Sequence, residues 1–128
     1  MISGKNRNML AIAQAAALNS DHRYRLGAVI VSGSRVMGVG WNKTRNRPAN
    51  VSFKHIKECT VHAEVDALRG LAPLRRASCF VARLDAYGSP TLARPCDDCW
   101  QALTDAGVTK VYWTVDEETV GVSRVEHF

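Results

Sequence analysis

The first third of the chain changes from a helical to a strand-like pattern of hydrophobic positions. An alanine-rich apolar run begins after Ser3, which can cap a helix, and continues to about Leu18. Residues 25–41 (RLGAVIVSGSRVMGVGW) then form two strand-like runs separated by a short polar stretch around Gly33. Glycine suits a tight turn between strands, so this part predicts a helix followed by an antiparallel hairpin.

The remainder of the chain alternates between predicted helices and strands. The predicted helices are residues 61–71 and 96–107, and the predicted strands are 77–84, 108–115 and 120–128. Polar residues dominate the stretches 42–59 and 85–94, which we expect to be loops. The order α-β-β-α-β-α-β predicts an α/β fold, with one sheet covered by helices on both faces. Strand-helix-strand units favour parallel pairing and the hairpin is antiparallel, so the sheet should be mixed.

Length and composition favour one soluble domain spanning residues 1–128. The chain has 128 residues, of which 46% are hydrophobic and 23% charged, as in ordinary globular proteins. Four cysteines are too few for a disulfide scaffold. The N-terminal run loosely imitates a secretory signal, but Gln14 interrupts it, and no segment is long enough to span a bilayer. We therefore expect a cytoplasmic protein without a membrane partner, in a reducing compartment.

The chain is basic, with a net charge of +5 and a sequence pI of about 9.3. Several of the basic residues are clustered, as in the predicted loop that contains Lys43 and Arg45. Such clusters attract phosphate, either on a free nucleotide or on a nucleic-acid strand. A solvated surface that keeps the protein soluble explains the charge equally well.

His62, Cys96 and Cys99 form a candidate metal site. One imidazole nitrogen and two thiolate sulfurs suit zinc, and Cys96 and Cys99 are three residues apart on one face of a predicted helix. Pro95 is well placed to begin that helix. His62 and the two cysteines then lie at helix N-termini, where the dipole favours thiolates. Three protein ligands leave one corner of a tetrahedral ion open, which is typical of a catalytic zinc site.

Glu64 decides between a structural and a catalytic zinc site. A fourth protein ligand would close the coordination shell, whereas a free carboxylate beside the open corner can move protons. Other interpretations of these residues are a redox cysteine pair, a structural zinc knuckle, or a zinc-stabilised nucleic-acid binding module without turnover. His55 and Cys59, four residues apart, could join a second zinc site.

The sequences HAE at 62–64 and PCDDC at 95–99 resemble the H-x-E…P-C-x-x-C signature of zinc-dependent nucleobase deaminases. The resemblance to the cytidine and deoxycytidylate deaminase superfamily extends over nearly the whole chain. GAVIV looks like its first strand, GWN at 40–42 like the start of its substrate loop, and AGVTKVYW like the strand after the cysteine helix. It implies a three-layer α/β/α fold with a central mixed sheet of about five strands.

The resemblance also implies roles for single residues. His62, Cys96 and Cys99 would bind one Zn2+, and Glu64 would shuttle protons. The backbone N–H of Ala63 would contact the carbonyl oxygen of a pyrimidine, and Asn42 would hold the sugar. Further candidates for substrate binding are Trp41, Lys43, Arg45 and Trp113, although a place in the core is the favoured interpretation of both tryptophans.

Three substrates fit a hydrolytic deaminase with this signature. Cytosine in single-stranded DNA suits the basic loops and is slightly favoured. Free deoxycytidylate is the alternative, but Trp41 and Lys43 replace the usual tyrosine and glycine of its nucleotide-binding loop. Adenosine in transfer RNA ranks third, because 49–59 would be an insertion and PCDDC lacks a hydrophobic middle. The sequence leaves the oligomeric state open.

Overall fold

The computed structural model describes residues 3–21, 24–44 and 60–125. Its main element is a mixed sheet, to which β1 (Arg25–Ser32), β2 (Arg35–Trp41), β5 (Ala77–Leu84), β7 (Val108–Thr114) and β8 (Val120–Arg124) contribute in the order β2-β1-β5-β7-β8. The pairing of β5 with β7 is parallel, and the other pairings are antiparallel. A short strand, β6 (Pro90–Thr91), pairs with the end of β5. The predicted mixed sheet is therefore confirmed.

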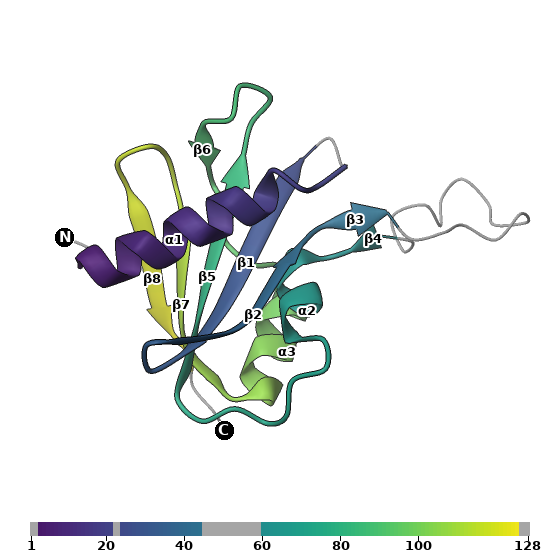
Figure 1. Cartoon of the computed structure of the whole chain (residues 1–128), viewed down its shortest axis with the longest axis vertical. Coiled ribbons are helices and arrows are strands. Elements are labelled where there is room, and N and C mark those ends of the chain that lie inside the picture. The colour runs from purple at the N-terminus through teal and green to yellow at the C-terminus, as the bar shows by residue number, and fades with distance from the viewer. Residues whose placement is uncertain (1–2, 22–23, 45–59, 126–128) are drawn as a thin grey trace, which may run out of the picture.

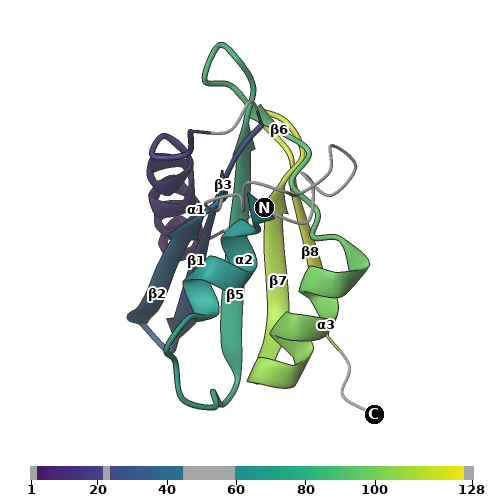
Figure 2. The ribbon, with the colours of Figure 1, turned by 90° about the vertical axis from the view of Figure 1, so that its right-hand side faces the viewer.

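Helices cover both faces of the sheet and give it three layers. Figure 1 shows α1 (Gly4–Ala17) across one face, with α2 (Ala63–Leu68) and α3 (Asp97–Ala106) behind the sheet. The view in Figure 2 places α1 on one side of the strands and the other two helices on the opposite side. Side chains alternate between the two faces of a strand, so one set of β5 side chains packs beneath α2 and α3 and the other beneath α1.

Two glycines allow the helices to lie directly on the sheet. A Cβ atom on Gly27 of β1 would lie 2.0 Å from the carbonyl oxygen of Ala13 in α1. On the opposite face, a Cβ atom on Gly40 of β2 would lie 2.4 Å from the backbone nitrogen of Ala67 in α2. Both distances are far below van der Waals contact, so these positions must be glycine for the layers to approach this closely.

The observed elements differ from the predicted ones mainly at their ends. Helix α2 has six residues, far fewer than the predicted segment 61–71, because its C-cap Arg69 leaves the helical conformation and Gly70 has a φ of 76°. The predicted loop 42–59 begins with β3 (Lys43–Thr44), which pairs with β4 (Thr60–Val61). The predicted loop 85–94 contains β6. Among the described helices, none combines the length and apolar character needed to cross a bilayer.

Candidate active site

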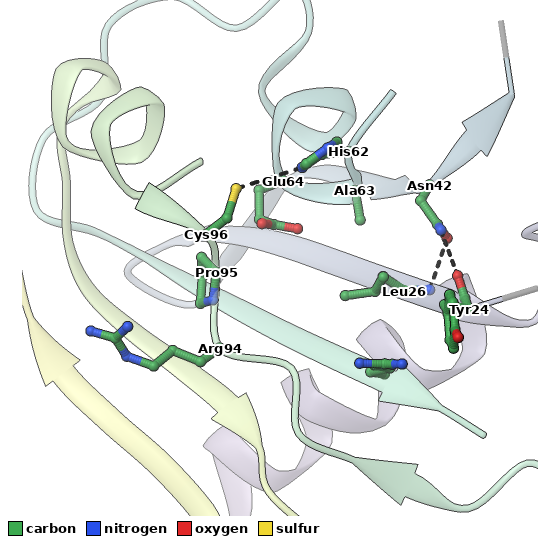
Figure 3. Close-up of a pocket in the computed structure, with 10 residues that line it drawn as sticks. Tyr24, Leu26, Asn42, His62, Ala63, Glu64, Arg94, Pro95 and Cys96 are labelled. Carbon is green, nitrogen blue, oxygen red and sulfur yellow. Dashed lines mark hydrogen bonds between the residues drawn. The ribbon is translucent and has the colours of Figure 1, made fainter. Parts of the chain in front are cut away.

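The predicted metal ligands meet where α2 and α3 begin. His62 is the N-cap residue of α2, Cys96 is the N-cap residue of α3, and Cys99 lies in the first turn of α3. The Nδ1 atom of His62 is 3.1 Å from the Cys99 Sγ atom and 3.8 Å from the Cys96 Sγ atom. Figure 3 shows the side chains of His62 and Cys96 turned toward each other. The fold thus brings the ligand atom of His62 together with those of two cysteines that lie 34 and 37 residues later in the sequence.

The geometry of these three atoms fits zinc. Within the described ranges, they are the group of potential ligands whose atoms all lie within 4.8 Å of one another. Bond lengths of about 2.3 Å to sulfur and about 2.0 Å to nitrogen place tetrahedral ligands roughly 3.5 Å apart. The observed separations from His62 Nδ1 lie on either side of that value. The carboxylate of Glu64 is not a member of this group.

Glu64 is a buried carboxyl group beside the ligand cluster. It belongs to the first turn of α2, and only 4% of the residue is exposed. Burial raises the pKa of its carboxyl above the ordinary value of 4.5, against the opposing effect of a hydrogen bond from the Cys99 thiol. A carboxyl with a raised pKa is suited to accepting and returning a proton near neutral pH. Figure 3 shows this group directed into the pocket.

Burial also raises the pKa of two neighbouring cysteine thiols. Burial raises the pKa of Cys99 well above the ordinary value of 9.0, and the nearby charge of Glu64 raises it further. The pKa of the fully buried Cys79 thiol is raised for the same two reasons. A divalent cation among the three ligands would act in the opposite direction and favour the Cys99 thiolate.

The ligand cluster opens into a pocket of about 390 Å³. Its walls come from both helix starts and from the sheet, and its lining residues are Tyr24, Leu26, Asn42, His62, Ala63, Glu64, Arg83, Arg94, Pro95 and Cys96. Figure 3 shows His62 and Cys96 on one side of this space and Tyr24 and Asn42 on the other. The size is within the range of pockets that hold small ligands.

Asn42 is buried, with 7% of the residue exposed, and lines the pocket. Its side-chain oxygen accepts a hydrogen bond from the backbone N–H of Leu26 at 2.8 Å. Its side-chain nitrogen donates to the backbone carbonyl of Tyr24, and both bonds are drawn in Figure 3. The amide therefore fixes the start of β1, and its expected contact with a sugar stays a prediction.

The other predicted substrate contacts differ in position. Ala63 lines the pocket, but Trp41, Lys43 and Trp113 do not. The ammonium group of Lys43 lies 3.1 Å from the carboxylate of Asp66 and 4.4 Å from the centre of the Trp41 ring. These contacts hold Lys43 against α2 instead of in the pocket.

Trp113 is 9% exposed and belongs to the hydrophobic core under α3, where its ring meets that of Trp100 edge-on at 6.1 Å. It is a core aromatic in this structure, which argues against base stacking. Arg45, His55 and Cys59 lie outside the described residues.

Sequence reasoning did not identify the basic wall of the pocket. Arg83 of β5 and Arg94, just before α3, both line it. The available signal for Arg83 was the alternation along β5, where the side chains of Cys79 and Val81 are buried in the core beneath α2 and α3. Arg83 is the next residue on that face, and a basic residue there interrupts an otherwise apolar set.

Comparisons with known proteins identify the family of the chain. The family model of the "cytidine and deoxycytidylate deaminase zinc-binding region" matches residues 3–115. No curated protein matches the sequence. Among solved structures, a cytidine deaminase from Burkholderia pseudomallei is similar, with a TM-score of 0.70 at 20% identity over 97% of this chain and 94% of that one.

A second similar structure is the dCMP deaminase of the cyanophage S-TIM5. In its apo form it has a TM-score of 0.63 and 22% identity, over 88% of this chain and 84% of that one. The same enzyme in complex with dCMP and dUMP has a TM-score of 0.56 and 20% identity, over 88% and 83% of the two chains. At this identity the structures show the shared fold, while the family match covers the motif-bearing residues. The chain therefore belongs to the zinc-dependent cytidine and deoxycytidylate deaminase family of hydrolytic enzymes.

Proposed function

We propose that this chain is a single catalytic domain that hydrolyses the amino group of cytosine in a deoxycytidine nucleotide. The observation that carries the proposal is the buried Glu64 carboxyl beside three close metal ligands at the wall of a nucleoside-sized pocket. Hydrolysis adds water to the amino-bearing ring carbon and expels ammonia, which requires proton transfers at adjacent atoms. Only Glu64, among the carboxyl groups of the described residues, lines this pocket.

Each residue has a defined role in this proposal. Zinc held by His62, Cys96 and Cys99 would supply Lewis-acid activation of the attacking water. Glu64 accepts one proton from that water and delivers it to the ring nitrogen. It then takes the remaining proton of the added hydroxyl and passes it to the amino group, so that ammonia leaves as the C–N bond breaks and the new carbonyl forms. The backbone N–H of Ala63 holds the carbonyl oxygen of the pyrimidine. Zinc binding needs reduced cysteines, which supports the expected location inside the cell.

A free deoxycytidylate is the substrate that the pocket supports best. The pocket of about 390 Å³ is suited to one nucleotide. A similar structure holds dCMP and dUMP, which shows that this fold can bind single pyrimidine nucleotides.

Cytosine in single-stranded DNA is the second candidate. One observation favours it, because Tyr24 and Arg83 also line a second hollow of about 390 Å³, which gives a longer substrate room beyond the first nucleotide. The net charge of +5 also favours binding to a polyanion.

The test is to incubate the zinc-loaded protein with four substrates and measure uracil, inosine and ammonia. The substrates are deoxycytidine, deoxycytidylate, a cytosine-containing DNA oligonucleotide and an adenosine-containing RNA hairpin. We expect deoxycytidylate to be turned over best. Inosine from the hairpin, with no uracil from any cytosine substrate, would overturn the proposal.

The Glu64→Gln variant tests the proton role directly. Removing a general acid and base should lower turnover roughly 100- to 10,000-fold while one zinc per chain is retained. The matched control is Glu118→Gln, which removes an exposed carboxylate in the connection between β7 and β8 and should leave turnover unchanged. Normal turnover in Glu64→Gln would refute the assignment.

A further inference from the structure

Arg83 and Tyr24 form a cation–aromatic pair in the wall of the pocket. The guanidinium carbon of Arg83 lies 4.6 Å from the centre of the Tyr24 ring, and both residues line the pocket. Among the described residues, no carboxylate lies within 4.0 Å of the Arg83 guanidinium, whereas Lys43 and Arg69 both have one. The charge of Arg83 is thus available to an anion that enters the pocket.

Arg83 and Glu64 line the same pocket from different elements. Residues 79, 81 and 83 share the face of β5 beneath α2 and α3. Arg83 lies near the end of that strand, and Glu64 lies in the first turn of α2. Because both residues line a pocket of about 390 Å³, one nucleotide in it can contact both.

The other basic residues near the pocket are paired with a carboxylate or directed away from Glu64. Lys43 is paired with Asp66 at 3.1 Å. The guanidinium carbon of Arg94 lies 5.1 Å from the Trp100 ring centre and 5.8 Å from that of Trp113. Figure 3 shows the Arg94 side chain directed away from Glu64. Arg83 is therefore the best-placed cation in the described part of the pocket.

The Tyr24 side belongs to a fixed part of the structure. The backbone carbonyl of Tyr24 accepts a hydrogen bond from the side-chain amide of Asn42. The backbone N–H of Leu26, two residues later, donates to the oxygen of the same side-chain amide. Leu26 is also the register partner of Arg83 in the pairing of β1 with β5. An arginine whose guanidinium lies over an aromatic ring can still direct N–H groups to a phosphate in paired hydrogen bonds.

We propose that Arg83 binds a phosphate group of the substrate and that Tyr24 is the residue that positions it. The proposal rests on the proposed function, because it assumes that the cytosine base lies at Glu64. Phosphate binding at this place would make the enzyme prefer a nucleotide to a nucleoside.

The second hollow leaves room for a phosphate at Arg83 to belong either to a free nucleotide or to a nucleic-acid strand. It is lined by Tyr24, Arg83, Leu84, Asp85, Ala86, Thr91 and Leu92, so the cation–aromatic pair lies between it and the reaction pocket. A phosphate at Arg83 can be the terminal group of a free nucleotide. It can also be the linkage to a neighbouring nucleotide whose base occupies the second hollow.

Steady-state kinetics of Arg83→Gln and Arg83→Lys test the proposal. The measured quantity is the ratio of kcat/KM for deoxycytidylate to that for deoxycytidine, because a merely structural role would lower both together. We expect Arg83→Gln to reduce this ratio roughly 10- to 100-fold, the usual value of charged hydrogen bonds, and Arg83→Lys to restore part of it. Arg35→Gln, an exposed arginine of β2, is the control for lost charge and should keep the wild-type ratio.

Three further substrates identify the source of the phosphate. These are deoxycytidine 3′-phosphate, the dinucleotide with a thymidine on the 5′ side, and a longer cytosine-containing oligonucleotide. If Arg83→Gln lowers kcat/KM only for the 5′-monophosphate, the phosphate belongs to a free nucleotide. If it also lowers kcat/KM for the dinucleotide and the oligonucleotide, the phosphate belongs to a strand. Either result supports phosphate binding by Arg83.

Direct binding of the product separates this proposal from the proposed function. The dissociation constants of dUMP and deoxyuridine can be measured by calorimetry without turnover. Tighter binding of dUMP that is lost in Arg83→Gln supports the proposal even if cytosine is not the substrate. Equal ratios in wild type and Arg83→Gln, or a ratio that falls in Arg94→Gln instead, would overturn it.

Discussion

Asn42 combines two tasks in one buried side chain. Both ends of its amide are used by backbone groups at the start of β1, and the residue also lines the pocket. Buried polar groups that lose their partners are costly, because water cannot replace the lost bond. Any change at this position should therefore affect both the stability of the fold and the shape of the pocket.

The substitution Asn42→Ala should lower the free energy of unfolding by about 1–3 kcal/mol, since it leaves the Leu26 N–H and the Tyr24 carbonyl without this partner. It should also raise KM, because the backbone of the pocket-lining residue Tyr24 would lose this bond. Denaturant unfolding and steady-state kinetics measure the two effects. The control is Asn19→Ala, an exposed asparagine after α1, which should change neither. Unaltered stability in Asn42→Ala would contradict the role given to the amide.

The site residues that could be predicted from the sequence are those that lie in short local motifs. His62 and Glu64 are two residues apart, and Cys96 and Cys99 are three apart, so short motifs at helix starts are enough to select them. Arg83 reaches the pocket only through the register of β5 against β1, which pairs it with Leu26, 57 positions earlier in the sequence. The pairing register of two distant strands cannot be predicted from the residues of either strand alone.

The contact of α2 with β2 is the element-scale feature on which the site depends. Helix α2 carries Ala63 and Glu64 in its first turn, directly after the metal ligand His62. Its backbone lies so close to β2 that a Cβ atom on Gly40 would be 2.4 Å from the Ala67 nitrogen and 2.6 Å from the Ala63 oxygen. Backbone atoms cannot move aside as the end of a flexible side chain can.

The substitution Gly40→Ala should destabilise the protein by about 1–3 kcal/mol and displace α2 from the sheet. A shift of α2 moves Glu64 relative to Cys96 and Cys99, so zinc content and kcat should fall together. Thermal unfolding, metal analysis and kinetics measure these effects. Gly4→Ala is the control, because nothing lies within 4 Å of the added methyl group there. Retention of full activity and zinc by Gly40→Ala would show that α2 can be displaced without harm to the site.

Asp116, in the connection between β7 and β8, should make the stability of the fold depend on pH. The Asp116 carboxylate accepts hydrogen bonds from the backbone N–H groups of Glu118 and Thr119 at 2.8 and 2.7 Å. These bonds lower its pKa from the ordinary value of 3.8. A lowered pKa in the folded state contributes stability that is present above about pH 4 and is lost as pH falls through the folded value.

Asp116→Asn should therefore be less stable than the wild type near pH 7, and the difference should shrink toward about pH 3. The asparagine oxygen can still accept both bonds, but without the charge that strengthens them. Urea unfolding at the two pH values measures the difference. A difference of the same size at both would show that the charge of Asp116 does not contribute.

The sequence was informative about the types of element and less so about their ends. The hairpin of β1 and β2, the strand β5 and the cysteine-bearing helix α3 lie where the pattern predicts them. The ribbon of β3 and β4 pairs Lys43 with Val61, and β6 pairs Pro90 with Leu84. These two-residue strands exist through tertiary pairing, which neither composition nor periodicity records.

At the scale of the whole molecule, one face of the sheet builds the site. The helices α2 and α3 lie together on that face, and their N-terminal ends bring His62 and Cys96 into contact range. The helix α1 covers the opposite face and contributes none of the residues that line the reaction pocket. The described residues that line the pocket therefore come from the starts of α2 and α3 and from the sheet edge near the start of β1.

The net charge of +5 leads to a prediction about salt that separates the two proposed substrates. Each phosphate contact with a single strand contributes about −0.7 to the slope of log affinity against log salt concentration. If Arg83 alone binds phosphate, the slope of log kcat/KM should be shallow, no steeper than about −0.7, for both deoxycytidylate and an oligonucleotide. If the protein follows a strand with several basic residues, the oligonucleotide slope should be about −2 or steeper, while deoxycytidylate keeps the shallow slope. Measurements from about 50 to 200 mM salt, with Arg83→Gln in parallel, give both slopes. A steep slope for deoxycytidylate itself would contradict a single phosphate contact at Arg83.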